Sequence, residues 1–284
     1  MLDPIRDWDD AFANMAHIPG SDRLPDQWTQ AAAAYRASGV RIDQGIAYGN
    51  AERARLDLIW PDGPPLGLAV FVHGGYWMQT DRQTWTHLAA GAVARGWAVC
   101  LPGYTLAPDI AIAGITQQIG AAIACAAGMV TGPLRLAGHS AGGHLVTRMI
   151  CDDTPLPRAV LDRIAGVVSI SGVHDLRALC HTRMNTTLKL DQATAQAESP
   201  VLHRPARAVP LTCWVGGGER PEFIRQSRLL AAIWNGLDLP TDCILDGNHD
   251  HFSVLDGLCT PDSALVRRWL ADDTAPTDTR KDTA

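Results

Sequence analysis

The chain has 284 residues, of which 46% are hydrophobic and 19% are charged, and its formal net charge is −6. This composition is typical of a globular protein with one large or two small domains. The negative charge argues against binding to nucleic acid or to an anionic membrane surface, because both attract basic faces. No apolar run approaches the roughly 20 residues that cross a bilayer, and the acidic N-terminus lacks an apolar signal core. We therefore expect a cytoplasmic protein.

The elements alternate in a regular order after a predicted helix at residues 25–38. Two strand-like pieces at 46–48 and 54–60 come first, and the second alternates with a period of two, which favours an antiparallel edge strand. Continuous apolar runs, which are typical of a covered parallel sheet, predict strands at 66–72, 97–101, 134–137, 164–170, 211–215 and 243–245. Helical patterns lie between them at 85–95, 112–127, 142–151 and 222–234.

This alternation predicts one doubly wound α/β domain over residues 1–271, with a mostly parallel central sheet and helices on both faces. Residues 175–199 break the rhythm, and we expect them to form a cap-like excursion over the carboxyl edge of the sheet. Residues 272–284 contain almost no apolar side chains, so we expect a disordered tail.

Seven cysteines are scattered along the chain without a C-x-x-C pair, at positions 100, 125, 151, 180, 213, 243 and 259. Most of them lie in apolar strand or helix patterns, where cysteine behaves as a small hydrophobic side chain. We expect reduced core residues, and neither a disulfide framework nor a metal site.

The most informative stretch is Gly138-His-Ser140-Ala-Gly142, which joins a predicted strand to a predicted helix. Glycines on either side allow a serine to occupy a strained turn with its hydroxyl exposed above the sheet edge. The helix that follows directs its N-terminal N–H groups at the space above that hydroxyl. This context predicts that Ser140 is a nucleophile, whereas the alternative is a glycine-rich structural turn.

A second motif, His-Gly-Gly-Tyr-Trp at residues 73–77, follows directly after a predicted strand. Acyl transfer needs N–H donors aimed at the oxygen that becomes negative in the tetrahedral intermediate. A Gly-Gly turn lets the backbone approach a substrate without Cβ atoms in the way. We therefore expect the N–H groups of Gly74 and Gly75, together with that of Ala141, to form an oxyanion hole.

A nucleophilic serine needs a base, and the base needs an acid that orients it. Where the serine lies in such a strand–turn–helix context, the acid follows it in the sequence and the histidine follows the acid. Glu219 lies in the loop after the predicted 211–215 strand, where the acid belongs, and Glu222 is the alternative at a helix start. His249 and His251 follow the last strand and compete for the role of the base. Their His-x-His spacing could also suggest a metal, but no third ligand is evident nearby.

Together these motifs resemble the arylformamidase (kynurenine formamidase) group of α/β-hydrolases. The resemblance covers nearly everything except the tail, and it rests on the segments 13–20, 73–77, 138–144, 171–176, 184–185, 190–191, 198–200, 219–223 and 251–252. Tyr76-Trp77 separates this group from the hormone-sensitive-lipase-like esterases, which usually carry another glycine there. The resemblance carries the base onto His251 and the acid onto Glu219, where many relatives have aspartate. Many bacterial members of the group are assigned only in general terms, as esterases.

The resemblance implies the α/β-hydrolase fold and a serine hydrolase with a triad of Ser140, Glu219 and His251 that needs no metal or organic cofactor. Its small-molecule substrate would be an aryl formamide such as N-formyl-L-kynurenine, a compound of tryptophan catabolism. Tyr76 and Trp77 would then bind the substrate, or they pack in the core. A carboxylesterase for short acyl esters would use the same residues, and a non-catalytic binding module is a third alternative. The oligomeric state stays open, with a homodimer among the alternatives.

Overall fold

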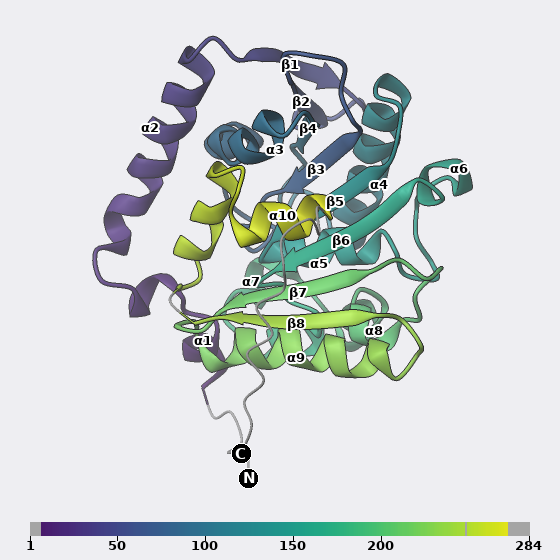
Figure 1. Cartoon of the computed structure of the whole chain (residues 1–284). Helices are drawn as coiled ribbons and strands as arrows, with labels where there is room; N and C mark the ends of the chain where they lie inside the picture. Colours follow the sequence, from purple (N-terminus) through teal and green to yellow (C-terminus); the bar gives the residue numbers. More distant parts are fainter. Residues whose placement is uncertain (1–6, 248, 272–284) are drawn as a thin grey trace, which may run out of the picture.

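One mixed sheet organises the computed structural model, which describes residues 7–247 and 249–271. Within these residues eight strands pair in the order β1-β2-β4-β3-β5-β6-β7-β8 (Figure 1). β2 runs antiparallel to β1 and β4, and the remaining neighbours are parallel. The strands are β1 (Arg41–Ala47), β2 (Arg55–Trp60), β3 (Leu68–Val72), β4 (Ala98–Pro102), β5 (Leu134–His139), β6 (Ile164–Ile170), β7 (Leu211–Gly216) and β8 (Thr241–Asp246). The prediction of disorder for residues 272–284 lies outside the described residues.

The helices fall into long elements beside the sheet and short ones in the connections. The α-helices are α1 (Trp8–Ala11), α2 (Leu24–Ala37), α3 (Ala90–Ala94), α4 (Ile112–Met129), α5 (Ala141–Arg148), α6 (Arg158–Leu161), α7 (Asn185–Leu188), α8 (Gln192–Ala197), α9 (Pro221–Asn235) and α10 (Ala264–Leu270). The 3₁₀-helices are η1 (Met15–His17), η2 (Ser21–Arg23), η3 (Arg82–Ala89), η4 (Leu176–His181), η5 (Pro200–Leu202) and η6 (Ser253–Cys259). The predicted excursion at 175–199 therefore consists of η4, α7 and α8.

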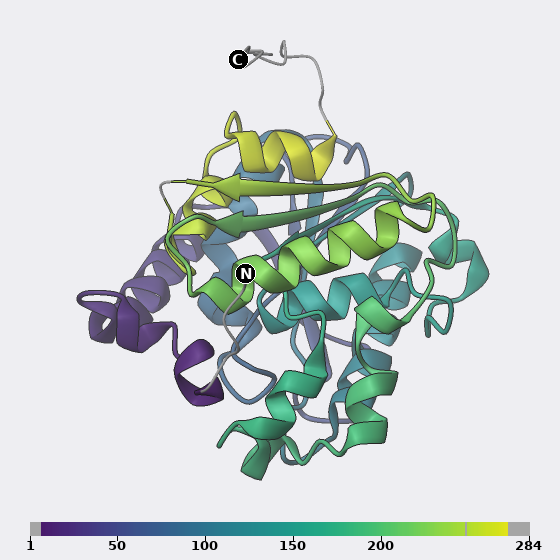
Figure 2. The same ribbon diagram turned by 90° about the horizontal axis from the view of Figure 1, so that it is seen from below.

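Alternate side chains of the central strands enter two separate cores, because successive residues of a strand point to opposite faces. Val70 and Val72 belong to the core that also contains buried residues of α4, α5 and α9. Ala69 and Phe71 belong to the core that contains residues of α3, η6 and α10. Figure 2 shows α9 and α10 on opposite sides of β7 and β8. The predicted architecture, a mostly parallel sheet with helices on both faces, is confirmed.

Helix α4 is long and apolar enough, by length and composition alone, to cross a membrane. Half of its residues are buried inside the protein, and it packs against β2, β3 and β4. An apolar helix that is buried in this way is typical of the core of a large globular domain.

The last strand differs from its prediction. Residues 243–245 were expected to be apolar on two covered faces, but β8 is an edge strand, and Leu245 is 45% exposed. Helix α9 packs against β8, whereas α10 packs against β5 and β6. Cys243 is therefore exposed, as is Cys259, in contrast to the buried position expected for most cysteines. Three apolar residues alone do not reveal whether a strand has one neighbour or two.

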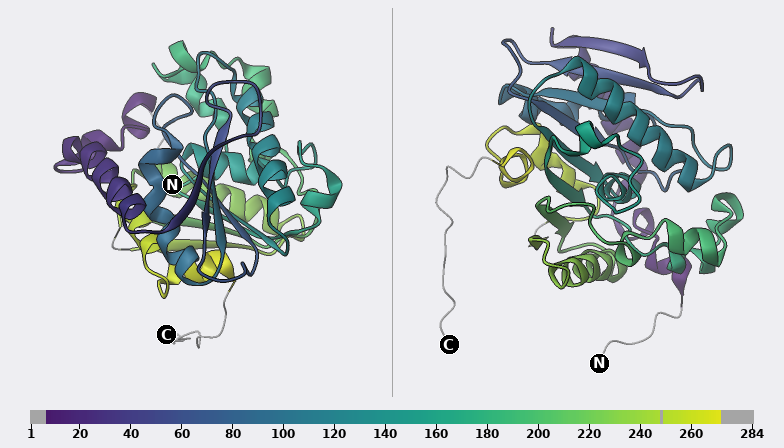
Figure 3. Two further views of the ribbon diagram at one scale, coloured as in Figure 1. Left: turned by 90° about the horizontal axis from the view of Figure 1, so that it is seen from above. Right: turned by 90° about the vertical axis from the view of Figure 1, so that its right-hand side faces the viewer.

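The carboxyl ends of the parallel strands meet at one edge of the sheet, and the loops at this edge carry the candidate site residues. The Gly-Gly loop follows β3, the serine turn follows β5, and the loops with Glu219 and His251 follow β7 and β8. Helix α1 lies beside the ends of β7 and β8 (Figure 1), while β1 and β2 form the opposite end of the sheet (Figure 3).

The serine turn is fixed by close contact between β3 and the start of α5. Ser140 has φ +55° and ψ −115°, a left-handed conformation that L-residues rarely adopt. A Cβ atom added at Gly142 would lie 1.9 Å from the carbonyl oxygen of Val72 and 2.7 Å from that of His73. Because both obstacles are backbone atoms, only glycine fits at residue 142.

Replacing Gly142 by alanine should therefore disrupt the fold rather than the chemistry alone. We expect Gly142→Ala to lower the free energy of unfolding by more than about 4 kcal/mol, or to prevent soluble expression. Gly128 in α4 is the matched control, because an added Cβ meets nothing within 4 Å there. Gly128→Ala should gain up to about 1 kcal/mol from helix propensity. Urea unfolding measures both, and equal stability of the two variants would contradict this account.

Candidate active site

Ser140 stands at the turn between β5 and α5. Its residue is only 2% exposed, and its backbone N–H donates to the carbonyl of Ile170 at 2.8 Å, which ties the turn to the end of β6. The N–H groups of the first turn of α5 have no partner within the helix and point beyond its N-terminus. The structure thus puts the predicted nucleophile at the positive end of a helix dipole.

Glu219 and His251 form a buried hydrogen-bonded pair. His251 Nδ1 lies 2.7 Å from Glu219 Oε2, and because a carboxylate only accepts, Nδ1 carries the proton. Nε2 is then the unprotonated nitrogen, available as a base. The other carboxylate oxygen, Oε1, accepts from the hydroxyl of Ser171 at 2.5 Å and from the N–H of Gly216 at 2.8 Å. Three hydrogen bonds therefore fix the carboxylate in one orientation.

The loops that carry this pair pack directly on each other. A Cβ at Gly216 would lie 2.4 Å from the carbonyl oxygen of His249, so the loops after β7 and β8 approach backbone to backbone. His139, the residue before the serine, has Nε2 2.7 Å from the carbonyl oxygen of His251. This bond joins the serine turn to the loop of the base. Burial, followed by the neighbouring His251, holds the pKa of His139 well below its usual range, so His139 is a neutral donor here.

Glu222 and His249, the alternatives for the acid and the base, lie outside this buried pair. Glu222 is in the first turn of α9, where both of its oxygens pair with the guanidinium of Arg225 at 2.7 Å. His249 Nδ1 lies 3.4 Å from the hydroxyl of Ser253, and its side chain is 36% exposed. Neither residue joins the buried pair, so the structure brings together the combination that the family resemblance implies.

The Gly-Gly loop after β3 is held by buried polar side chains. His73 Nδ1 lies 2.7 Å from the carbonyl oxygen of Gly74, and Thr80 donates to the same oxygen at 3.0 Å. Tyr104 stacks on the His73 ring and donates to the His73 carbonyl at 3.1 Å. Within the described part of the chain, the N–H groups of Gly74 and Gly75 donate to no protein acceptor.

Among the described residues, the N–H group of Ala141 also donates to no protein acceptor. A Cβ on Gly74 would lie 3.1 Å from the Cβ of Ser140, so this loop passes directly beside the serine. Two of the residues predicted to supply oxyanion-hole N–H groups, Gly74 and Ala141, therefore lie directly beside Ser140, on the loop after β3 and at the start of α5, and Gly75 follows Gly74 in the same loop.

Tyr76 and Trp77 follow this loop in a strained backbone conformation, with φ +50° and +58°. The Trp77 indole is fully buried and packs edge-on against His144 at 5.2 Å between ring centroids. Of the two alternatives predicted for Trp77, substrate binding and core packing, the structure shows core packing. Tyr76 is half-buried; its hydroxyl donates to the carbonyl of Phe12 at 2.5 Å and accepts from Asn14 at 3.3 Å. Burial raises the pKa of Tyr76 well above its usual range, so the phenol stays protonated.

An N-terminal segment, residues 8–18, closes the site from outside. Phe12 packs edge-on against Phe223, whose ring in turn lies 4.4 Å from that of His251. A small hollow of about 90 Å³ separates this segment from the loops after β7 and β8, and it is lined by Asn14, His17, Ile18, Gly218, Glu219, Arg220 and His251. No role was predicted for these N-terminal residues or for Ser171. The available signal for both was that segments 13–20 and 171–176 share in the family resemblance.

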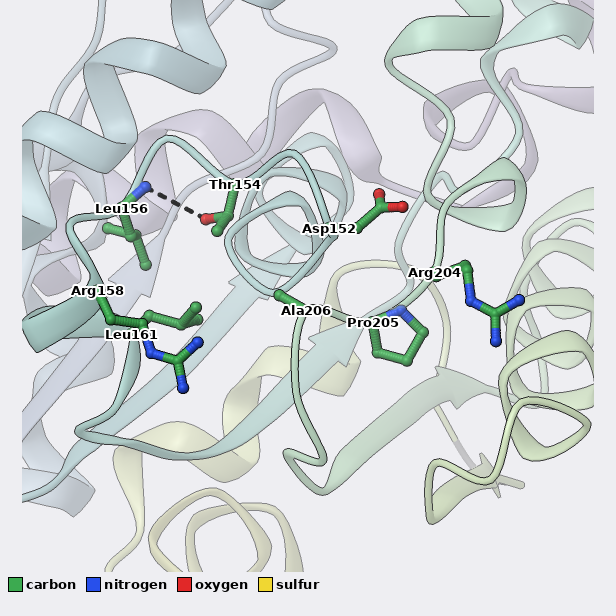
Figure 4. A pocket seen from close by; sticks show the side chains of 8 residues that line it. All are labelled: Asp152, Thr154, Leu156, Arg158, Leu161, Arg204, Pro205 and Ala206. Atoms are coloured by element: carbon green, nitrogen blue, oxygen red, sulfur yellow. Dashed lines mark hydrogen bonds between the residues drawn. The ribbon is translucent and has the colours of Figure 1, made fainter.

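A larger hollow of about 440 Å³ lies away from these residues (Figure 4). Its residues come just before β6 and β7, at the amino ends of the strands, and are Asp152, Thr154, Leu156, Arg158, Leu161, Arg204, Pro205 and Ala206. The candidate catalytic residues follow the carboxyl ends, so the smaller hollow is the one beside the chemistry.

A group with metal-ligand atoms, Asp152, Asp153 and His203, adjoins the larger hollow. Arg148 forms two hydrogen bonds to the Asp153 carboxylate at 2.6 and 2.7 Å, and His203 Nδ1 lies 3.0 Å from Asp152. The ligand atoms of the group are therefore already engaged with protein partners. The group lies beside the larger hollow and contributes no residue to the candidate site.

Comparison with known proteins defines the class. A family model described as "alpha/beta hydrolase fold" matches residues 69–238, which include β3 to β7 and the serine turn. The chain belongs to the α/β-hydrolase fold family, and it is an enzyme, a hydrolase. This excludes the non-catalytic binding module.

Particular relatives are more informative. Kynurenine formamidase of Danio rerio is 28% identical over 236 residues, covering 79% of this chain and 80% of its own length. That of Drosophila melanogaster is 25% identical over 246 residues, with 81% and 80% covered. Among solved structures, a protein of Silicibacter sp. TM1040 with a provisional assignment as a thioesterase is 44% identical, with a TM-score of 0.89 and 93% and 99% covered. Esterase B of Lactobacillus rhamnosis, 18% identical, shares the fold with a TM-score of 0.66 over 93% of each chain. The predicted resemblance to kynurenine formamidases is confirmed.

Buried uncharged histidines around the site should make the fold sensitive to acid. Burial lowers the pKa of His73 to about 4 and that of His174 to about 3. Between those values and about 6.5, the unfolded chain binds protons that the folded protein does not. The free energy of unfolding should therefore fall as the pH decreases from about 6.5 to 4, by up to about 1.4 kcal/mol per pH unit for each histidine.

Urea unfolding at a series of pH values measures this slope. His174→Gln removes one of the histidines and should reduce the slope by about one proton. A wild-type stability that stays flat between pH 6.5 and 4.5 would contradict the prediction.

Proposed function

We propose that the chain is a serine hydrolase that cleaves an aryl formamide such as N-formyl-L-kynurenine, with Ser140, His251 and Glu219 as its triad. The observation that carries the proposal is the buried His251–Glu219 pair, 2.7 Å between Nδ1 and Oε2, behind a serine held in a strained turn. Buried carboxylate–imidazole pairs of this kind orient a base toward a nucleophile. The named function of the 25–28% identical relatives supports the choice of substrate.

The first half of the reaction forms a covalent intermediate. His251 Nε2 takes the proton of Ser140 as Oγ attacks the formyl carbon. The oxygen becomes negative and accepts hydrogen bonds from the N–H groups of Gly74, Gly75 and Ala141, each of which typically lowers a barrier by about 2.7–4 kcal/mol. When the C–N bond breaks, the His251 imidazolium gives its proton to the leaving arylamine nitrogen. The products of this half are the free arylamine and a formyl ester on Ser140.

The second half releases formate. Water enters the place of the amine, His251 takes one of its protons, and the hydroxide attacks the formyl carbon. The intermediate collapses and Ser140 Oγ recovers its proton from His251. Glu219 stays ionised throughout and stabilises the imidazolium in both halves. No metal or organic cofactor takes part in this scheme.

Tyr76 is the side chain that we propose as the wall of the acyl side, with Trp77 packed behind it. A formyl carbon carries only hydrogen, so a narrow acyl side suits it. The strained backbone at these two residues supports this assignment, because such strain is retained where function needs a fixed position. A carboxylesterase that acts on short acyl esters remains the second candidate, because it would use the same residues; the 44% identical relative also carries an assignment to ester-type chemistry, as a thioesterase.

The triad assignment predicts unequal effects within matched pairs of residues. Ser140→Ala should lower kcat/KM at least about a thousandfold on any acyl substrate, since only Oγ forms the intermediate. His251→Ala should be nearly as damaging, and His249→Ala should cost less than about tenfold. Glu219→Gln should likewise lower kcat/KM more than Glu222→Gln does. Circular dichroism and unfolding midpoints control for folding. A reversed order in either pair would refute that assignment.

Ser171 is predicted to be a positioning residue that acts through Glu219. Ser171→Ala removes a hydrogen bond to a charged group, worth about 1.5–3 kcal/mol, and should lower kcat about tenfold or more with little change in KM. Ser171→Gly should behave similarly, because the φ of +52° at this residue suits glycine. Ser169→Ala is the control, since the Ser169 hydroxyl lies 3.2 Å from His174 Nε2. A kcat unchanged in both Ser171 variants would exclude the role.

A narrow acyl side of the site predicts a preference for short acyl groups among esters that share one phenol leaving group. We expect kcat/KM to fall at least tenfold from the formyl through the acetyl to the butyryl ester, because a clash with Tyr76 outweighs the about 1–3 kcal/mol that one buried methylene contributes. Tyr76→Ala should flatten the series. A flat or rising series in the wild type would favour the carboxylesterase.

A further inference from the structure

The small hollow beside His251 is bounded by two separate parts of the chain. On one side lie His251 and Glu219, and on the other lie three residues of the N-terminal segment, Asn14, His17 and Ile18. In the proposed mechanism His251 protonates the departing nitrogen, so this nitrogen must lie next to the His251 ring. The N-terminal segment therefore faces the scissile bond from the side opposite the base.

A formamide differs from an ester at the atom that leaves. The amide nitrogen is planar, because its lone pair is shared with the carbonyl group. Once Ser140 Oγ has added to the carbonyl carbon, the nitrogen becomes pyramidal, and its lone pair must face His251 Nε2 to receive the proton. The N–H bond then points away from the base. An ester oxygen has two lone pairs and no hydrogen, so its departure requires no such arrangement.

The N–H group that points away from the base needs a hydrogen-bond acceptor. A donor that is buried without a partner loses the hydrogen bond that it made to water, and this loss raises the free energy of the complex. The pyramidal nitrogen exists only after the addition of Oγ. An acceptor placed for its N–H therefore stabilises the transition state more than the bound substrate, and such an acceptor raises kcat.

Asn14 has a buried acceptor that no other described residue uses. The residue is 4% exposed and lines the hollow. Its Nδ2 donates to the hydroxyl of Tyr76 at 3.3 Å, and that hydroxyl gives its own proton to the carbonyl of Phe12. Because the hydroxyl has no second proton, it can only accept from Asn14, which fixes Nδ2 toward Tyr76 and leaves Oδ1 on the other side of the amide.

The other side chains of the hollow are less suited to accept this hydrogen bond. Both oxygens of Glu219 already accept, from Ser171, from a backbone N–H group and from the base. Arg220 only donates, and it holds the N-terminal segment through the carbonyl and the carboxylate of Asp10. His17 also bonds to Asp10, at 2.7 Å, and its side chain is 40% exposed, so water competes for its ring.

We propose that Asn14 Oδ1 accepts the scissile N–H of the formamide in the transition state, and that this contact favours amides over esters. The proposal rests on the proposed function and adds a catalytic residue to it. The N–H proton stays on the nitrogen throughout, and His251 supplies the second proton, so the leaving group departs as a neutral arylamine. Tyr76 is then a positioning residue that acts on Asn14 through its hydroxyl, while its ring forms the wall of the acyl side.

Two substrates that differ only at the leaving atom test this role. They are N-(2-acetylphenyl)formamide and 2-acetylphenyl formate, which share the formyl group and the aryl ketone. Asn14→Leu keeps the size of the side chain and removes the acceptor. The ratio of kcat/KM for the formamide to that for the ester should fall at least about tenfold in this variant, chiefly through kcat for the formamide. Tyr76→Phe should lower the same ratio by a smaller factor, because Asn14 is no longer fixed.

His17→Ala and Arg183→Gln are the matched controls, and both should keep the wild-type ratio. His17 lines the same hollow. Arg183 holds the N-terminal segment through its ion pair with Asp9 at 2.9 Å, but it does not line the hollow. A lowered ratio in His17→Ala without one in Asn14→Leu would refute the role of Asn14. An equal loss in Arg183→Gln would also refute it, because the segment would then act only as a cover.

The outcomes separate this role from the proposed function. An unchanged ratio in Asn14→Leu, with a folded variant by circular dichroism, would refute the role of Asn14 and leave the proposed function standing. A wild type that does not hydrolyse the formamide would refute the proposed function, whatever its activity on the ester, and the role of Asn14 with it.

Discussion

The contact between Gly142 and the end of β3 is the constraint on which the rest of the site depends. Because no side chain separates α5 from the carbonyl oxygen of Val72, the loop after β3 and the turn after β5 are forced together. The parallel register of these strands, with Val72 opposite Gly138, sets their relative height. The backbone N–H groups of the loop after β3 and the hydroxyl of Ser140 in the turn after β5 are thereby brought close together. Neither segment could supply both kinds of group alone.

Buried histidines keep these loops in place without taking part in proton transfer. His73 holds the loop after β3, His139 holds the loop of the base, and His144 Nε2 lies 2.7 Å from the carbonyl oxygen of Glu198. Burial lowers the pKa of all three, so each one is a neutral ring that bonds to backbone oxygen. His251 has a different kind of partner, because its Nδ1 faces a carboxylate and not a backbone oxygen. This carboxylate partner distinguishes the candidate base from the three structural histidines.

Local signals in the sequence predict the central part of the molecule well. Apolar runs predict the strands, and the glycines around Ser140 predict a turn whose tight packing the structure explains. Features that depend on distant neighbours were not predicted. The edge position of β8 follows from what lies beside it, and the choice between the two alternatives for Trp77, substrate contact and core packing, follows from its contact with His144, 67 residues later in the sequence. The pairing of Asp10 with Arg220 spans 210 residues and leaves no periodic pattern to detect.

The order of these residues along the chain has a consequence for synthesis. β3, its loop and the serine turn leave the ribosome before the residues of the candidate acid and base, and His251 follows Ser140 by 111 residues, or roughly 5–20 seconds at about 5–20 residues per second. During that interval the nascent chain carries its serine without the imidazole and carboxylate to which the proposed mechanism assigns its activation. The N-terminal segment, although made earliest, finds its partner only when residue 220 has emerged. Under the proposed mechanism, the growing polypeptide therefore cannot hydrolyse cellular acyl compounds until almost all of it has been translated.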